Sequence, residues 1–137
     1  MLVTVSISSV ARVCQLMVDQ LMADEGQPVC LAAVDHNGSL IYFYRMDDAP
    51  ERLINIAIGK AYTAARMGVS TAMFRDRLIN ENLSMADFLD EKFTSLPGGV
   101  PLFNQLQLIG AVGVSGRALE DDVLLCQQFA ECIQMSL

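Results

Sequence analysis

The sequence lacks tryptophan, has a single histidine, and has charged side chains at only 18% of its 137 positions. One histidine excludes metal sites built from two or more imidazoles. The phosphate-binding motif GxxxxGK[ST], the hydrolase motif GxSxG and the zinc motif HExxH are absent, and no GxGxxG follows an expected strand. These absences exclude the best-known nucleotide-binding, serine hydrolase and zinc protease classes. No acid–base pair or activated nucleophile is recognisable either.

Basic residues are scarce. Nine Lys and Arg residues stand against 16 Asp and Glu residues, which gives a net charge of −7 without any basic cluster. Such a chain is repelled by phosphate backbones and anionic membrane surfaces, so we expect no nucleic-acid and no membrane partner. No run approaches the ~20 apolar residues of a membrane span. Residues 1–10 are too short an apolar stretch, and too poor in basic residues, for a secretory signal. We therefore expect a cytoplasmic protein.

The four cysteines, Cys14, Cys30, Cys126 and Cys132, form no CxxC pair, and no histidine stands near them at ligand spacing. Each lies among apolar residues, so we expect free, buried thiols that pack as small hydrophobic side chains. A redox pair or a thiolate ligand is the alternative.

Hydrophobic residues make up 53% of the chain. Its length is typical of one domain with one core, spanning residues 1–137, and such a domain needs neither disulfides nor a metal to fold. Few charges remain to cover the surface, so we expect some apolar surface to be buried between the subunits of a homo-oligomer. A well-packed monomer with an alanine-rich core is the alternative.

Three segments have the apolar spacing of amphipathic helices, with hydrophobic residues three and four positions apart: residues 7–21, 53–65 and 123–133. Ser6 and Ser8 are cap candidates for the first helix. Asp48, with Glu51 three residues later, has the pattern of a capping box for the second.

The second helix is expected to end at Gly68 through a left-handed residue. Ser70-Thr71 is expected to cap a shorter helix that runs to Leu78. Glu120, Asp121 and Asp122 come at the expected start of the last helix, where carboxylates suit the helix dipole.

Residues 29–34 form a continuous apolar run that is typical of a strand buried on both faces. Residues 40–46 are rich in aromatic side chains and predict a second strand. Asn37 and Gly38 lie between them, and this dipeptide is typical of a hairpin turn in which both residues have positive φ.

A second hairpin is predicted for residues 102–103 and 106–114, whose long strand we expect at the centre of the sheet. Residues 93–96 have the composition of one further short strand. Hairpins make a sheet antiparallel, and the helical segments must cover it. The sequence therefore predicts an α+β domain, an antiparallel sheet flanked by helices on both faces.

Several short segments occur in an order that resembles one known family. They are Val34-Asp35 with Asn37-Gly38, Tyr44 to Asp47 with Ala49-Pro50, Ile56-Ala57, Lys60-Ala61 with Thr63-Ala64, Leu96 to Pro101, and Ile109-Gly110 with Gly113 to Gly116. Together they span nearly the whole chain. The chain is similar to the GlcG/HbpS-like haem-degrading family, which includes the C-terminal domain of PduO-type proteins.

This resemblance implies a profilin-like antiparallel sheet flanked by helices, and assembly into higher oligomers. It implies haem or a related tetrapyrrole as the ligand of some members, and genes near glycolate, diol or cobalamin metabolism for others. One member's iron ligand falls in the stretch before Pro97, where this chain has Phe93, which cannot ligate iron. No haem ligand can therefore be matched, and we expect no protein-bound metal site.

The family does not share one established reaction, so three functions remain open. We expect a small-ligand-binding or accessory protein, because no catalytic constellation is recognisable. A haem-degrading or cobalamin-associated enzyme is the second hypothesis. A structural subunit of an oligomeric assembly is the third.

Lys60 lies on or beside the buried face of the second helix. A buried lysine needs a partner or a ligand anion, unless its side chain snorkels to water. Gly98 and Gly99 expose backbone N–H groups that suit an oxygen atom. The alternative is that Lys60 pairs with a neighbouring acid and that Pro97 and Pro101 hold a tight connection.

Arg45 ends the aromatic strand and suits a ligand carboxylate, or else a salt bridge to a neighbouring aspartate. His36 is the evident ligand candidate, although a hairpin tip also favours polar residues for their own sake. We expect a small-anion site between the helix that carries Lys60 and the loop 97–101, with Arg45 within reach.

The expected homo-oligomer is tested directly by sedimentation. The monomer mass is 15.0 kDa. Because apolar residues exceed what one small domain normally buries, the protein should sediment at a multiple of this mass at micromolar concentration. Analytical ultracentrifugation that finds only the monomer would contradict the expectation.

Overall fold

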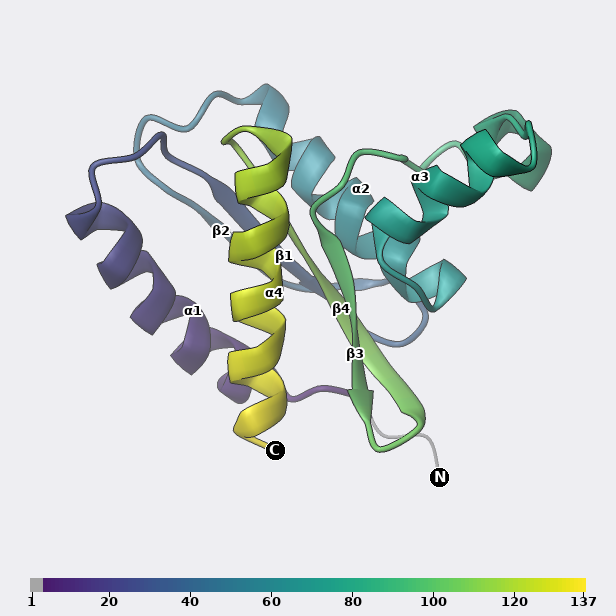
Figure 1. Ribbon diagram of the computed structural model, residues 1–137. Helices are drawn as coiled ribbons and strands as arrows, with labels where there is room; N and C mark the ends of the chain where they lie inside the picture. Colours follow the sequence, from purple (N-terminus) through teal and green to yellow (C-terminus); the bar gives the residue numbers. More distant parts are fainter. Residues whose placement is uncertain (1–3) are drawn as a thin grey trace.

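The computed structural model describes residues 4–137, and residues 1–3 of the N-terminal stretch considered above lie outside them. Its centre is one antiparallel sheet of four strands in the order β2-β1-β4-β3 (Figure 1). The strands are β1 (Cys30–Val34), β2 (Leu40–Arg45), β3 (Gly99–Asn104) and β4 (Gln107–Ser115). The long strand β4 lies between β1 and β3, as predicted.

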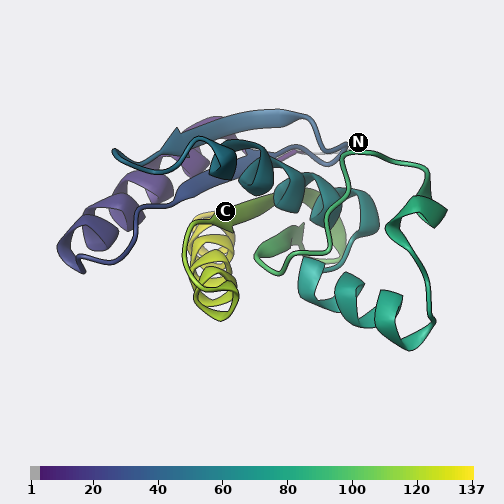
Figure 2. The same cartoon turned by 90° about the horizontal axis from the view of Figure 1, so that it is seen from above.

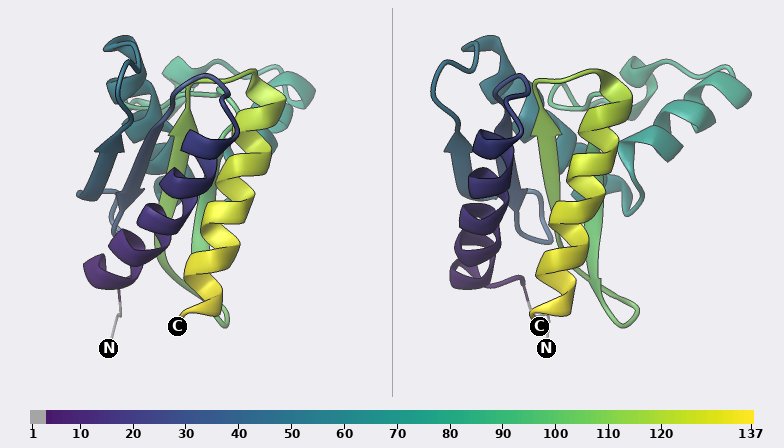
Figure 3. Two further views of the ribbon diagram at one scale, coloured as in Figure 1. Left: turned by 90° about the vertical axis from the view of Figure 1, so that its left-hand side faces the viewer. Right: turned by 60° about the vertical axis from the view of Figure 1, so that its left-hand side comes forward.

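Helices cover both faces of the sheet. The helices α1 (Ile7–Ala23) and α4 (Leu119–Met135) lie side by side on one face (Figure 3), and α2 (Arg52–Met67) lies on the other. The helix α3 (Thr71–Asn80) and the short 3-10 helix η1 (Met85–Phe88) extend to one side of the sheet (Figure 2). The predicted α+β class is confirmed.

Successive side chains of β1 point to opposite faces of the sheet and so belong to two separate cores. Leu31 and Ala33 belong to the core beneath α1 and α4, whereas Cys30, Ala32 and Val34 belong to the core beneath α2. All five residues of β1 are buried. A strand covered on both faces is apolar at every position, which is the continuous run seen in the sequence.

Sequence patterns predicted several helix starts and ends correctly. The Ser6 side chain accepts from the backbone N–H of Ser9 at the start of α1, and that of Ser70 accepts from Met73 at the start of α3. Gly68 ends α2 with φ 69°.

Three local predictions were wrong. The α2 N-cap is Glu51 without a side-chain cap, and Asp48 has φ 68°. In the first turn only Gly38 has positive φ, because the Asp35 side chain accepts from two backbone N–H groups and closes a longer loop. Residues 93–96 form no strand.

The cysteine prediction holds in part. All four thiols are free, and Cys14, Cys30 and Cys126 are buried, but Cys132 is exposed on α4. Burial raises the pKa of the Cys14 thiol to about 11, so this cysteine stays protonated and unreactive at neutral pH.

Glycines let α2 approach the sheet closely. A Cβ at Gly113 of β4 would collide with the Ala57 carbonyl oxygen, and one at Gly99 of β3 would collide with the carbonyl oxygen of Lys60. Real Cβ atoms do not approach backbone this closely. These two positions therefore require glycine for steric reasons alone.

Lys60 lies at this contact and is fully buried. Its Nζ donates to the Val114 carbonyl at 2.8 Å and to Asp122 Oδ2 at 3.2 Å. The same carboxylate accepts from the backbone N–H groups of Gly116 and Arg117. One ion pair thus joins α2, the end of β4 and the start of α4. Burial lowers the pKa of Lys60, and the charge of Asp122 opposes that change.

No helix within residues 4–137 combines the length and the hydropathy needed to cross a membrane. Several large apolar side chains are largely exposed, among them Leu89 at 93%, Leu106 at 98% and Met135 at 86%. They lie on different elements, so they agree with subunit contacts without locating one. The homo-oligomer stays a prediction.

The substitution Lys60→Met should lower the free energy of unfolding by about 3–5 kcal/mol, because it leaves the buried Asp122 carboxylate without its counter-charge. Adding Asp122→Asn to this variant should restore at least about 1 kcal/mol, since an amide oxygen can still accept from Arg117 and carries no charge. Urea denaturation measures both changes.

Lys92→Met is the matched control. Lys92 is exposed, so the same change of side chain should alter stability by no more than about 0.5 kcal/mol. If Lys60→Met proved as mild as this control, the ion pair would not hold the layers together.

Candidate functional site

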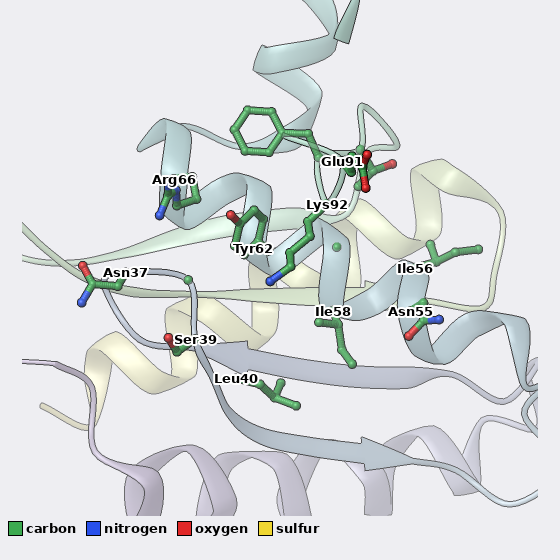
Figure 4. A pocket seen from close by; sticks show the side chains of 14 residues that line it. Asn37, Ser39, Leu40, Asn55, Ile56, Ile58, Tyr62, Arg66, Glu91 and Lys92 are labelled. Carbon is green, nitrogen blue, oxygen red and sulfur yellow. The ribbon is translucent and has the colours of Figure 1, made fainter. Parts of the chain in front are cut away.

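The largest cavity described lies beside α2, on the side away from α4, and has a volume of about 710 Å³. This volume is within the usual range of small-molecule sites. Three segments enclose the cavity: the first hairpin turn, one face of α2, and a stretch after η1 (Figure 4). Its lining residues are Asn37, Gly38, Ser39, Leu40, Asn55, Ile56, Ile58, Gly59, Tyr62, Arg66, Glu91, Lys92, Phe93 and Thr94.

The hairpin turn lies directly against α2. A Cβ at Gly38 would lie 2.9 Å from Cδ1 of Tyr62 and 3.5 Å from Cδ of Arg66, and Gly38 has φ 92°. Glycine is therefore required here both by the backbone conformation and by the Tyr62 ring. Gly38, which the sequence predicts as a hairpin turn residue, also forms part of one wall of the cavity.

The stretch after η1 is held on α2 by side-chain hydrogen bonds. The Tyr62 hydroxyl donates to Asp90 Oδ2 at 2.6 Å. Thr63 donates to the Gly59 carbonyl within α2 and accepts from the backbone N–H of Thr94. Residues 91–94 thus form a fixed wall although they have no regular secondary structure.

Aromatic rings support this wall from behind. Phe93 packs edge-on against Tyr62, with ring centroids 6.0 Å apart, and against Phe74 of α3 at 5.7 Å. Phe88 of η1 packs on Phe74 at 5.1 Å. This cluster explains why the segment 93–96 has an aromatic residue without being a strand: Phe93 packs between α2 and α3.

Two cations flank the ring of Tyr62. The guanidinium carbon of Arg66 lies 5.6 Å from the ring centroid and Lys92 Nζ lies 5.4 Å from it. Within residues 4–137, neither side chain forms a salt bridge. Figure 4 shows Arg66, Tyr62 and Lys92 side by side along the cavity. The lining of the cavity thus includes two cations and one carboxylate, that of Glu91, and the Asp90 carboxylate lies next to it.

The hydrogen bond between Tyr62 and Asp90 alters the pKa of both groups. It raises the pKa of the Tyr62 hydroxyl, since the phenol donates to a carboxylate, and it lowers the pKa of Asp90. At neutral pH the pair is therefore a neutral phenol bound to a carboxylate.

The structure brings Lys60, Gly98 and Gly99 together, inside the protein. A Cβ at Gly98 would lie 2.8 Å from Lys60 Nζ. The Gly99 N–H donates to the Thr71 hydroxyl, and Lys60 is paired with Asp122. This arrangement matches the alternative of an internal pair. Ligand binding at these residues stays a prediction.

Arg45 and His36 lie elsewhere. Arg45 donates twice to the Ala49 carbonyl, at 3.0 and 2.8 Å, and so fixes the connection from β2 to α2. His36 is half-buried in the first turn, next to the cavity-lining Asn37, and its Nδ1 has no hydrogen-bond partner among the described residues. No group of three or more potential ligands in residues 4–137 is arranged to hold a metal ion.

The residues that line this cavity were not predicted as site residues from the sequence. A signal was present, because Asn55, Gly59, Tyr62 and Arg66 recur at helical spacing on the face of α2 opposite its alanines. The residues that lie opposite this face of α2 follow no such spacing and could not be predicted from the sequence. Lys92 and Phe93 come from an irregular segment about 30 positions later.

Three curated relatives match much of the chain. An uncharacterized 15.0 kDa protein in the dhaT-dhaS intergenic region of Citrobacter freundii is 33% identical over 108 residues, 77% of this chain and 75% of that protein. Protein GlcG of Escherichia coli K12 is 40% identical over 87 residues, 64% and 63% of the two chains. The corrinoid adenosyltransferase PduO of Salmonella typhimurium is 30% identical over 73% of this chain, but the match spans only 30% of PduO.

Two solved structures have the same fold over nearly the whole chain. The protein ORFY of Klebsiella pneumoniae has a TM-score of 0.85 and 26% identity, with 97% of this chain and 92% of that chain covered. The haem complex of PduOC has a TM-score of 0.78 and 26% identity, with 95% of each chain covered.

A family model described as haem degrading protein HbpS-like matches residues 5–131. This match covers every strand and all but the end of the last helix, so the family expectation from the sequence is confirmed. The chain belongs to the HbpS-like family.

Proposed function

We propose that this protein binds haem or a related tetrapyrrole in the cavity beside α2, and acts as a binding or accessory protein. The observation that carries the proposal is the combination of Arg66 and Lys92, two cations without salt bridges, with an apolar and aromatic lining. A tetrapyrrole such as haem has the matching chemistry, a broad apolar ring with anionic carboxylates at its edge.

The lining residues fit such a ligand. Leu40, Ile56 and Ile58 offer apolar contacts, and Tyr62 and Phe93 offer aromatic ones. Binding pockets in proteins commonly combine an apolar lining with a few polar groups that fix the orientation of the ligand. The similarity to the haem complex of PduOC supports the same ligand class.

The cations favour haem over a corrinoid. Haem has two carboxylates, whereas most peripheral groups of a corrinoid are neutral amides. Charge-assisted bonds from Arg66 and Lys92 therefore contribute more to haem binding. The relative named corrinoid adenosyltransferase supports an accessory role in cobalamin metabolism, and the family resemblance implies glycolate or diol metabolism as the alternatives.

Adding haem to the protein should shift the Soret band. Arg66→Gln and Lys92→Gln should each weaken binding by about fivefold, because each removes one partly solvated charge contact. Raising the ionic strength should weaken binding by the parent and less so by these variants. Titration followed by absorbance measures all of these affinities.

Arg75→Gln is the matched control, because Arg75 is exposed on α3 and does not line the cavity. It should bind haem as tightly as the parent. If the haem spectrum in the presence of the parent protein stays that of free haem, the proposal is refuted. If all three variants bind haem equally tightly, the haem site does not lie in this cavity.

The same sample separates a binding protein from an enzyme. A shifted Soret band, without bleaching over hours when a reductant and oxygen are added, supports binding. Bleaching of the band with release of iron supports haem degradation. An equally tight complex with cobalamin would support the corrinoid alternative.

A further inference from the structure

The lining of the cavity limits which side chain can reach a bound iron. Its residues include no histidine, cysteine or methionine, the usual protein ligands of haem iron. Ferric iron also accepts anionic oxygen, and a tyrosine holds haem in catalase. Among the lining side chains, only the phenol of Tyr62 and the carboxylate of Glu91 can supply such an oxygen.

Tyr62 is the better positioned of the two. Its ring is held by Phe93 on one edge and by the Gly38 turn, and its hydroxyl is fixed by the 2.6 Å bond to Asp90. Glu91 is exposed on the irregular segment, and its side chain has no hydrogen-bond partner among the described residues. A pre-oriented ligand loses less conformational entropy when it binds a metal.

The Asp90 carboxylate raises the pKa of the Tyr62 phenol, so a phenolate forms here only with the help of the positive charge of bound iron and of two nearby cations. Arg66 and Lys92 lie 5.6 and 5.4 Å from the ring centroid, and both cations stabilise negative charge on the ring and its oxygen. The hydroxyl oxygen uses its proton toward Asp90, so its lone pairs remain available to an electron acceptor.

We propose that Tyr62 is the axial ligand of ferric haem in this protein, and that Asp90 accepts the phenolic proton. The O–H bond of Tyr62 breaks as its oxygen binds the iron, and the proton passes to Asp90 Oδ2 and from there to solvent water, because the pKa of Asp90 is lowered. No electron is transferred, so the step needs no oxidant or reductant. This inference rests on the proposed function, because it requires haem in the cavity beside α2.

A consequence concerns the oxidation state. An anionic phenolate binds Fe(III) more strongly than Fe(II), so the bound haem should be held in the ferric state. The protein would then store or deliver ferric haem, and reduction of the iron would weaken the complex.

The test compares haem with metal-free protoporphyrin in Tyr62→Phe. Phenylalanine keeps the ring and its contact with Phe93 but removes the ligating oxygen. Affinity for ferric haem should fall at least about tenfold, while affinity for protoporphyrin should stay within about twofold. The phenolate-to-iron absorption and the phenolate bands in the resonance Raman spectrum should also disappear.

Two further variants complete the design. Tyr44→Phe is the matched control, because Tyr44 lies outside the lining of this cavity, and it should leave both spectra and affinities unchanged. Tyr62→His offers a different strong ligand at the same position, so its ferric haem spectrum should become that of imidazole coordination. Circular dichroism checks that each variant is folded.

The outcomes separate this inference from the proposed function. If the parent binds neither haem nor protoporphyrin, both are refuted. If the parent binds haem and Tyr62→Phe has the same affinity and spectrum, only Tyr62 as ligand is refuted. In that case His36→Ala and Glu91→Gln show which of the two neighbouring side chains reaches the iron.

Discussion

The buried ion pair between Lys60 and Asp122 holds the layers of this fold in one arrangement. Lys60 reaches from α2 past the sheet to the end of β4 and the start of α4. A buried charge is costly unless its partners are in place, so α2 cannot shift along the sheet without leaving both charges unpaired. Gly99 and Gly113 allow the close approach that the pair needs. The exposed face of α2 is thereby placed at a defined distance from the first hairpin turn.

That exposed face of α2 borders a cavity at which two of the protein's nine basic residues lie. The chain as a whole is acidic, yet Arg66 and Lys92 meet at one cavity without salt bridges to carboxylates of the described residues. Two cations in this position suit the anionic ligand of the proposed function. The membership of the HbpS-like family and the haem complex of a structural neighbour agree with a ligand of this chemistry.

Where sequence patterns failed, a tertiary contact had replaced a local one. The expected capping box at Asp48 and Glu51 does not form, because Arg45 binds the Ala49 carbonyl and sets the path into α2. Residues 93–96 look like a strand because Phe93 is apolar, but that ring fills the space between α2 and α3. The sequence left open whether Lys60 pairs with an acid, binds a ligand anion or reaches water, and in the structure its partner Asp122 lies 62 positions away along the chain.

The sequence by itself determined the helices and strands with strong hydrophobic periodicity, the antiparallel hairpins, the α+β class and the family, because these depend on local spacing and on ordered short motifs. The tertiary structure alone decided which polar groups meet. Tyr62 and Arg66 are neighbours on one helix, but Lys92 and Asp90 reach them only because the aromatic cluster folds the segment after η1 back onto α2. Such contacts join residues far apart in the chain, and no local pattern records them.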